Sequence, residues 1–206
     1  MAKAGKSIKK TFFDVKIPVT SSKVSLYGTT PEEFVGKVVK LDLTRNLRGK
    51  SLELKSKVKL EGNELVGEPI SLLLVGSFIR RMIRKGSDYV EDSFIVDCKD
   101  AKIVIKPFLI TRNKVSRAVR NELRNNSKKF LESYLKARPI KEVFSDLMAN
   151  KLQKELSLKL KKIYPLALCE IRAVDILTEA EIKRLEEKAE EKASRTEEKA
   201  EKFEVK

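Results

Sequence analysis

The segment Ser51–Glu61, SLELKSKVKLE, alternates polar and apolar residues almost without a break. Successive side chains of a β-strand point to opposite faces, so a period of two predicts a half-buried strand with one charged, wet face. Residues 38–43 predict a second strand, and the segment between the two strands has the composition of a turn with basic residues. Together they predict a hairpin with a basic tip.

Further strands are expected on both sides of this hairpin. Residues 89–98 and 102–111 predict a strand pair. Pro107 places the second strand at an edge or a bulge, because proline has no N–H for the ladder. Residues 12–19 and 166–176 are weaker strand candidates at the two ends of the body.

Helices fill most of the remainder. Residues 72–84 predict a helix that stops before Gly86 and buries a stripe with Leu72, Ile79, Met82 and Ile83. Arg80, Arg81 and Arg84 then fall outside the buried stripe.

A long basic helix is predicted over residues 114–135. Four of its apolar residues lie within about 80° of arc at about 100° per residue, and its bases form a separate stripe. These four are Val115, Val119, Leu123 and Phe130. Leu131 and Leu135 fall on the basic side, which predicts a bend or a restart near Asn125. Residues 140–163 continue helically in one or two pieces. The inward positions of that segment are predicted to be Val143, Phe144, Leu147, Leu152, Leu156 and Leu160.

The order of these elements predicts an α+β fold. Antiparallel hairpins with helices inserted late favour a curved antiparallel, barrel-like sheet with flanking helices over regular βαβ alternation. The expected organisation is a flexible basic arm (residues 1–11), one α+β domain (residues 12–178), and a mixed-charge helix or disordered tail (residues 179–206).

The charge points to a polyanionic partner. The 206 residues contain 45 Lys and Arg against 30 Asp and Glu, a net charge of +15. Residues 1–178 hold 37 of the bases and 20 of the acids, whereas residues 179–206 hold eight bases and ten acids. The densest block, residues 112–141, has ten bases and two acids. A surface of this kind is typical of nucleic-acid binding, although a solvated helix face is the simpler alternative.

The residue types and motifs that the sequence lacks exclude most enzyme classes. The chain has no histidine, which removes the commonest general base and metal ligand, and it has only two cysteines, Cys98 and Cys169. Two distant cysteines predict buried free thiols rather than disulfides or a zinc site. The glycines form no phosphate-binding loop, so no catalytic residue, metal or cofactor is expected. Neither a long apolar run nor a signal sequence occurs, so no membrane contact is expected and the cytoplasm is the predicted location.

The predicted RNA contacts are bases of the arm, the hairpin tip, the first helix and the Arg-rich helix, because several cations on one face can meet successive phosphates. The segment Lys10–Lys16 also mixes aromatic and basic residues, which fits base stacking and core anchoring equally. The full set is Lys3, Lys6, Lys9, Lys10, Arg45, Arg48, Lys50, Arg80, Arg81, Arg84, Arg112, Lys114, Arg117, Arg120, Arg124, Lys128 and Lys129.

Two alternatives remain open at this point. The same charge fits a free RNA- or DNA-binding regulatory protein. A Mg²⁺-dependent nuclease would need Glu91, Asp97 and Asp100 to lie together, with Asp88 and Asp92 nearby. Strand alternation separates these carboxylates, so surface charges at strand ends are the preferred interpretation.

Three strings resemble the archaeal and eukaryotic small-subunit ribosomal protein family S3Ae, also written eS1. They are Phe12-Phe13-Asp14-Val15-Lys16-Ile17-Pro18, then Gly36-Lys37-Val38 leading into Leu41-Asp42-Leu43, and Lys162-Ile163-Tyr164-Pro165-Leu166. The resemblance covers residues 8–178, and the short N-terminus looks archaeal. It implies a non-enzymatic ribosomal protein on the platform near the mRNA exit. The implied partners are small-subunit rRNA, neighbouring ribosomal proteins and the message itself.

Overall fold

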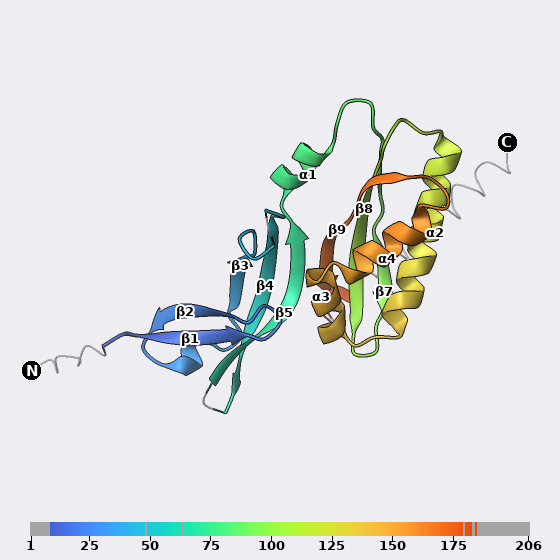
Figure 1. Cartoon of the computed structure of the whole chain (residues 1–206). Coiled ribbons are helices and arrows are strands. Elements are labelled where there is room, and N and C mark those ends of the chain that lie inside the picture. Colours follow the sequence, from blue (N-terminus) through green and yellow to red (C-terminus); the bar gives the residue numbers. More distant parts are fainter. Residues whose placement is uncertain (1–8, 48, 63, 179, 183, 185–206) are drawn as a thin grey trace, which may run out of the picture. The chain divides into compact units, whose positions relative to one another are not determined.

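The computed structural model describes residues 9–184 except residues 48, 63, 179 and 183. The chain divides into two units, residues 1–175 and residues 176–206. In the second unit, Thr178 begins a helical turn: its hydroxyl donates to the Glu181 carboxylate at 2.8 Å, and the Glu181 N–H donates to the Thr178 carbonyl. Most of the predicted arm and tail lies outside the described residues. The first unit holds the helices that are numbered in Figure 1 and nearly all of the sheet.

The first two strands form an antiparallel hairpin. They are β1 (Thr11–Ile17) and β2 (Ser22–Gly28). The predicted strand over residues 12–19 is confirmed by β1, whereas β2 was not predicted. Val15 and Ile17 are buried and alternate with exposed Asp14 and Lys16, so the hairpin has one packed face and one wet face.

The predicted pairing of residues 38–43 with residues 51–61 is confirmed. Strand β3 (Val38–Asp42) pairs antiparallel with β4 (Leu52–Glu61), after a short 3-10 helix, η1 (Pro31–Phe34). Leu54 and Val58 of β4 are fully buried, and the lysines between apolar positions face outward. The alternation therefore gives the half-buried strand that it predicts.

Strand β5 (Glu64–Leu74) corrects the predicted helix over residues 72–84. It pairs antiparallel with β4 along almost its whole length, ending at the pair Leu52↔Leu74. The apolar run at its end fits a helix or a buried strand equally well. The long partner strand decides the outcome because it offers the backbone groups of the run a continuous ladder.

The helix that follows is short. Helix α1 spans only Gly76–Met82 and buries Phe78 and Ile79. Met82 and Ile83, which were expected inside, are exposed. Seven residues cannot bury the longer stripe that the prediction required.

Strands from the second half of the chain complete the sheet. They are β6 (Tyr89–Glu91), β7 (Phe94–Asp97), β8 (Lys102–Thr111) and β9 (Leu166–Ile176). The predicted strand over residues 89–98 is thus split in two, and both pieces pair antiparallel with β8. The ladder breaks between Glu91↔Phe108 and Phe94↔Ile105, and Pro107 falls in this gap. Because β8 also borders β9, Pro107 lies inside the sheet at an interruption, not at an edge.

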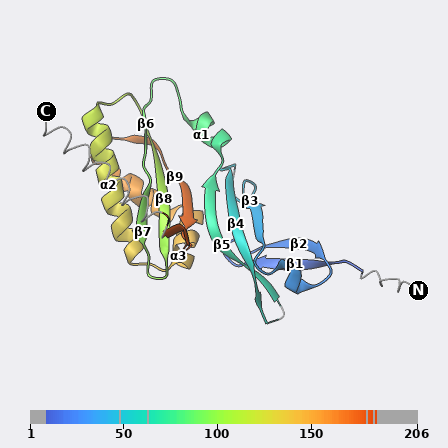
Figure 2. The ribbon, with the colours of Figure 1, turned by 180° about the vertical axis from the view of Figure 1, so that it is seen from behind.

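Three longer helices accompany these strands. They are α2 (Arg117–Lys136), α3 (Ile140–Met148) and α4 (Lys151–Leu160). Helix α2 contacts β6, β7 and α4, and α3 contacts α4 (Figures 1 and 2). Residues 140–163, expected as one or two helical pieces, form two helices separated at Asn150, which has a positive φ of 56°. All six predicted inward residues are buried. Among the described helices, none is long and apolar enough to cross a bilayer.

The restart that was one of the two predicted outcomes near Asn125 does not occur, because α2 is one continuous helix of 20 residues. Leu131 and Leu135 are fully buried although they were assigned to the basic side. The buried row is Leu123, Ser127, Leu131 and Leu135, and each i+4 step advances about 40° around the helix. The packed face therefore winds around α2.

The α+β class is confirmed, but the sheet is open. Its nine strands follow the main order β2-β1-β5-β9-β8-β6, and β3, β4 and β7 are attached to it. The sheet is also mixed: β1 runs parallel to β5 at Val15↔Leu65 and Lys16↔Val66. The strands approach closely at Gly67, where a Cβ would lie 3.1 Å from Cγ1 of Ile17.

Candidate nucleic-acid interface

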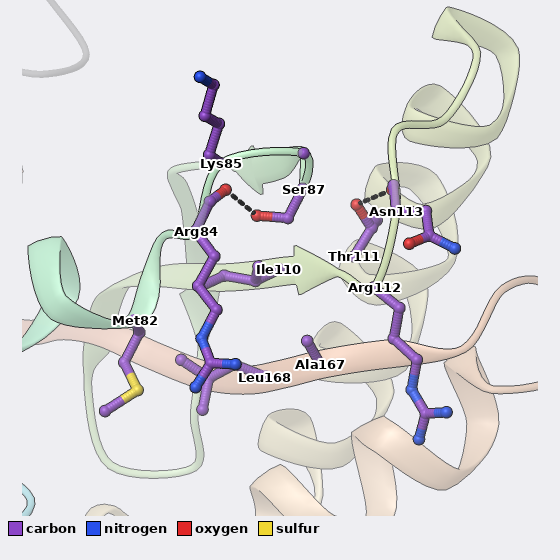
Figure 3. A pocket seen from close by; sticks show the side chains of 11 residues that line it. Met82, Arg84, Lys85, Ser87, Ile110, Thr111, Arg112, Asn113, Ala167 and Leu168 are labelled. Atoms are coloured by element: carbon purple, nitrogen blue, oxygen red, sulfur yellow. Dashed lines mark hydrogen bonds between the residues drawn. The ribbon is translucent and has the colours of Figure 1, made fainter.

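A pocket beside the end of β8 brings together cations that are far apart in the sequence. It has a volume of about 480 Å³ and is lined by Arg84 and Lys85, by Arg112, and by Ile110, Ala167 and Leu168 (Figure 3). No carboxylate of the described residues lines it. The structure therefore joins two predicted contacts, Arg84 and Arg112, in one site.

Hydrogen bonds fix the loops that carry these cations. The Ser87 hydroxyl donates to the Arg84 carbonyl at 2.7 Å, and the Thr111 hydroxyl donates to the Asn113 carbonyl at 2.8 Å (Figure 3). Fully buried Thr111 also accepts a hydrogen bond from the Asp88 N–H at 3.0 Å. One hydroxyl thus ties the loop after α1 to the loop before α2.

The electrostatics of the pocket favour an anion. Within the described part of the chain, Arg84, Lys85 and Arg112 form no ion pair with a carboxylate. Unpaired cations that line one pocket repel one another, and a phosphate relieves that repulsion. The planar guanidinium groups of arginine also match phosphate oxygens in bidentate geometry. The pocket is suited to a phosphate group.

The Arg-rich stripe of α2 is less uniform than predicted. Arg117 and Arg124 are exposed, but Arg120 is half-buried, and its Nε has no hydrogen-bond partner. Arg124 reaches back to the Glu91 carbonyl at 3.5 Å, and Lys128 lies 5.8 Å from the centre of the Phe94 ring. The stripe runs along the junction of α2 with β6 and β7, so only part of its charge faces solvent.

Lys50 does not belong to an exposed surface. The side chain of Lys50 is 10% exposed and that of Glu170 is 13% exposed. The Lys50 ammonium group donates to the Glu170 carboxylate at 2.5 Å and to the side-chain amide oxygen of Asn150 at 2.7 Å. The pair links the turn before β4 to α4 and β9. Lys50 is therefore not an exposed base of the kind that the prediction of an RNA contact assumed, because its ammonium group is already paired inside the fold.

The other predicted contacts lie on exposed positions. Arg81 packs its guanidinium 5.8 Å from the centre of the Phe78 ring, and Lys10 lies 5.9 Å from that of Tyr27. Lys3, Lys6 and Arg48 lie outside the described residues. The exposed predicted bases are Lys9, Lys10, Arg45, Arg80, Arg81, Arg84, Arg112, Lys114, Arg117, Arg124, Lys128 and Lys129.

Sequence reasoning missed two groups of bases. Lys85 ends the run that starts at Arg80, so composition alone could have found it. The second group, Lys159 and Lys162, lines a groove of about 420 Å³ between α2 and α4 together with Lys129 and one acid, Glu122. Lys159 lies 4.3 Å from the centre of the Phe130 ring. Alternation of these lysines with the buried leucines of α4 was the available signal. Both groups enlarge the positive surface.

The carboxylates of the nuclease hypothesis are dispersed. Asp88 accepts the Val115 N–H at 3.0 Å, Glu91 pairs with Arg172 at 2.8 Å, and Asp100 accepts the Ile140 N–H at 3.3 Å. Among the described residues no group of three or more possible metal ligands forms. The nuclease hypothesis has no metal site in this part of the chain.

The two thiols are free and protonated near neutral pH. Burial raises the pKa of Cys98 to about 11, and Asp100 and Asp97 contribute to the shift. Burial raises the pKa of Cys169 to about 12, where Glu170 adds to the shift and Lys50 opposes it. Neither thiol is a reactive thiolate under these conditions.

Comparison with known proteins adds the family. The model of the ribosomal S3Ae family matches residues 2–180. The chain belongs to this family. Several archaeal proteins are similar to this S3Ae member, and each carries the name small ribosomal subunit protein eS1. The resemblance stated from the sequence is therefore confirmed.

The relatives of this S3Ae member align over most of their length. The protein of Nanoarchaeum equitans is 27% identical over 165 residues, covering 76% of this chain and 83% of the relative. The protein of Methanothermobacter thermautotrophicus is 25% identical over 180 residues, covering 83% and 92%. The protein of Saccharolobus islandicus is 26% identical over 181 residues, covering 84% and 86%. The similarity thus extends over most of the chain and of each relative.

Proposed function

We propose that this chain is a structural, non-enzymatic constituent of the small ribosomal subunit in the cytoplasm and that it binds rRNA. The observation that carries the proposal is the pocket that Arg84, Lys85 and Arg112 line and that no carboxylate of the described residues lines. The family match and the name of the relatives support the ribosomal setting.

The proposed surface includes the pocket, the exposed bases of α1 and α2, and the groove between α2 and α4. Each base neutralises a phosphate and releases its counterions, which lowers the repulsion between RNA strands that pack closely. The lysines of residues 1–11 add to this surface in the proposal, and the mixed-charge segment 179–206 is not part of it. The site in the particle is proposed to be the platform near the mRNA exit, beside neighbouring proteins and the message.

Salt dependence gives a first test of the mechanism. With about ten phosphate contacts, affinity for small-subunit rRNA is expected to fall by roughly 10³- to 10⁵-fold between 50 and 200 mM salt. Filter binding of the purified chain to rRNA measures this slope. A salt-insensitive interaction contradicts phosphate binding.

The double variant Arg84→Glu/Arg112→Glu tests the pocket itself. We expect it to fold normally, because both side chains are exposed, and to be depleted at least tenfold from small subunits after a high-salt wash. The matched control is Lys40→Glu/Lys57→Glu, which makes the same change in net charge on β3 and β4, away from the pocket.

Two outcomes contradict the proposal. Equal depletion of both variants shows that net charge alone matters. A wild-type chain that stays in the free pool and never sediments with subunits favours a free RNA- or DNA-binding regulator.

A further inference from the structure

The β1–β2 hairpin anchors itself with one of its two adjacent phenylalanines. Phe13 faces inward, and its ring centre lies 5.8 Å from that of buried Phe34. Phe13 also packs against the cluster that contains Val15 and Leu65. Anchoring of this segment is therefore complete without Phe12.

Phe12 and Tyr27 remain on the outer face. They are 73% and 59% exposed, they are directly opposite in the strand register, and their ring centres are 5.0 Å apart with the planes tilted by 46°. Large aromatic side chains are normally stabilised by burial, so the fold gains little from leaving this pair in water. The pair points to a ligand.

The charge around the pair identifies the kind of ligand. Lys9 and Lys10 are exposed next to Phe12, and the Lys10 ammonium lies 5.9 Å from the centre of the Tyr27 ring. Lys23 is exposed on the same outer face, directly opposite Lys16. It lies four residues from Tyr27 along β2, which is about 13 Å at roughly 3.3 Å per residue.

Of the two nearby acids, Glu64 is ion-paired, whereas Asp14 is hydrogen-bonded to a neutral hydroxyl. Asp14 accepts a hydrogen bond from the Ser25 hydroxyl at 2.6 Å, and Glu64 pairs with Lys16 at 2.6 Å. Among the described residues Lys10 and Lys23 form no ion pair, although Lys23 is near enough to Glu64 to help lower the pKa of that carboxyl. The aromatic pair thus lies between two cations that can meet anions. That pattern matches a single nucleic-acid strand, whose bases stack on aromatic rings while its phosphates contact lysines.

We propose that the outer face of the β1–β2 hairpin binds unpaired RNA nucleotides, with a base stacked on Phe12 and Tyr27 and the flanking phosphates held by Lys10 and Lys23. Paired bases have their faces covered by neighbouring pairs, so a duplex does not supply this contact. The inference rests on the proposed RNA-binding function and adds the class of RNA that this face takes.

The absence of tryptophan from the chain allows a direct test. Phe12→Trp in the full-length protein introduces a single indole at the proposed stacking position. Its fluorescence is expected to be quenched at least twofold by a ten-nucleotide oligouridylate and to be unchanged by an abasic oligomer with the same number of phosphates. Val38→Trp, at an exposed position of β3, is the matched control, and oligouridylate should leave it unchanged.

Affinity provides the second measurement. Phe12→Ala/Tyr27→Ala is expected to weaken oligouridylate binding at least tenfold and to leave binding of the abasic oligomer and of duplex RNA unchanged. Val38→Ala is the control. Circular dichroism of the double variant should match that of wild type, because both side chains lie outside the core.

The outcomes separate the two proposals. If wild type binds the base-bearing and abasic oligomers equally and the indole is not quenched, stacking is overturned while rRNA binding stands. If wild type binds neither oligomer nor rRNA, both are overturned.

Discussion

Basic residues of the first unit differ in whether an acid neutralises them. Lys50 is enclosed and its ammonium group is held by Glu170 and Asn150, whereas Arg84, Lys85 and Arg112 line an open pocket without a carboxylate. Lysine occurs in both groups, so residue type does not separate them. Only the presence of an acid from a distant strand decides whether a base stabilises the fold or remains available to a phosphate.

The same distinction divides the densest basic block. Arg138 donates to the Asp146 carboxylate and lies 3.8 Å from the centre of the Tyr134 ring, while the Tyr134 hydroxyl donates to Asp146 at 2.9 Å. This cluster joins the end of α2 to α3. Arg117 and Arg112, in the same block, have no such partners among the described residues, so net charge per segment overstates the charge available for binding.

The largest expected effect comes from removing the paired base. Lys50→Met leaves the Glu170 carboxylate enclosed without its partner, and we expect the free energy of unfolding to fall by about 3 kcal/mol. Urea denaturation followed by circular dichroism measures the change. Lys50→Met/Glu170→Leu is the control and should recover most of the loss, because it removes both charges. If the folded Lys50→Met protein loses as much RNA affinity as an Arg112 variant, the distinction between the paired and the unpaired bases is wrong.

An intermediate effect is expected from an unpaired base. Arg112→Ala should reduce rRNA affinity about tenfold and lower the magnitude of the slope of log K against log salt by about 1, since one phosphate contact is lost. The free energy of unfolding should stay within about 0.5 kcal/mol of wild type. Lys57→Ala, at an exposed position of β4, serves as the control for both measurements. An unchanged salt slope would remove Arg112 from the interface.

The third effect is a pH dependence beside the Lys50 pair. Folding raises the pKa of Cys169 from about 9 to about 12, so the folded state retains the thiol proton after the unfolded state has lost it. The resulting stability is fully present below pH 9 and is lost as pH rises from 9 toward 12. Cys169→Ala should therefore flatten the decline in unfolding free energy between about pH 9 and 11. A parallel decline in both proteins would contradict the raised pKa.

Strict alternation made part of the fold predictable. β4 and the leucine row of α4 each present one periodicity, and both were found where the sequence predicts them. β5 was missed because its segment contains Gly67 and Pro69 and ends in three leucines, which fit a helix equally well. Its identity depends on pairing with β4, which is a tertiary fact.

The site was predictable only in its composition. The bases were identified, but the meeting of Arg84 with Arg112 depends on how the loop after α1 approaches the end of β8. The partner of Lys50 lies 120 residues away, so nothing local distinguishes it from Arg45. Phe12 is exposed and Phe13 is not because the face of β1 that carries Phe13 packs on Phe34. Two adjacent phenylalanines in the sequence do not show which of the two faces is packed.

The buried Thr111 hydroxyl has a consequence for the thermodynamics of binding. Because it ties together the two loops that hold the pocket, their backbone is ordered before any ligand arrives. An anion entering the pocket then restricts only side-chain rotamers, and less conformational entropy is lost than if it had to close a loose loop. The pocket is in this sense preorganised, and the hydroxyl that achieves it carries no charge and lies beneath the surface.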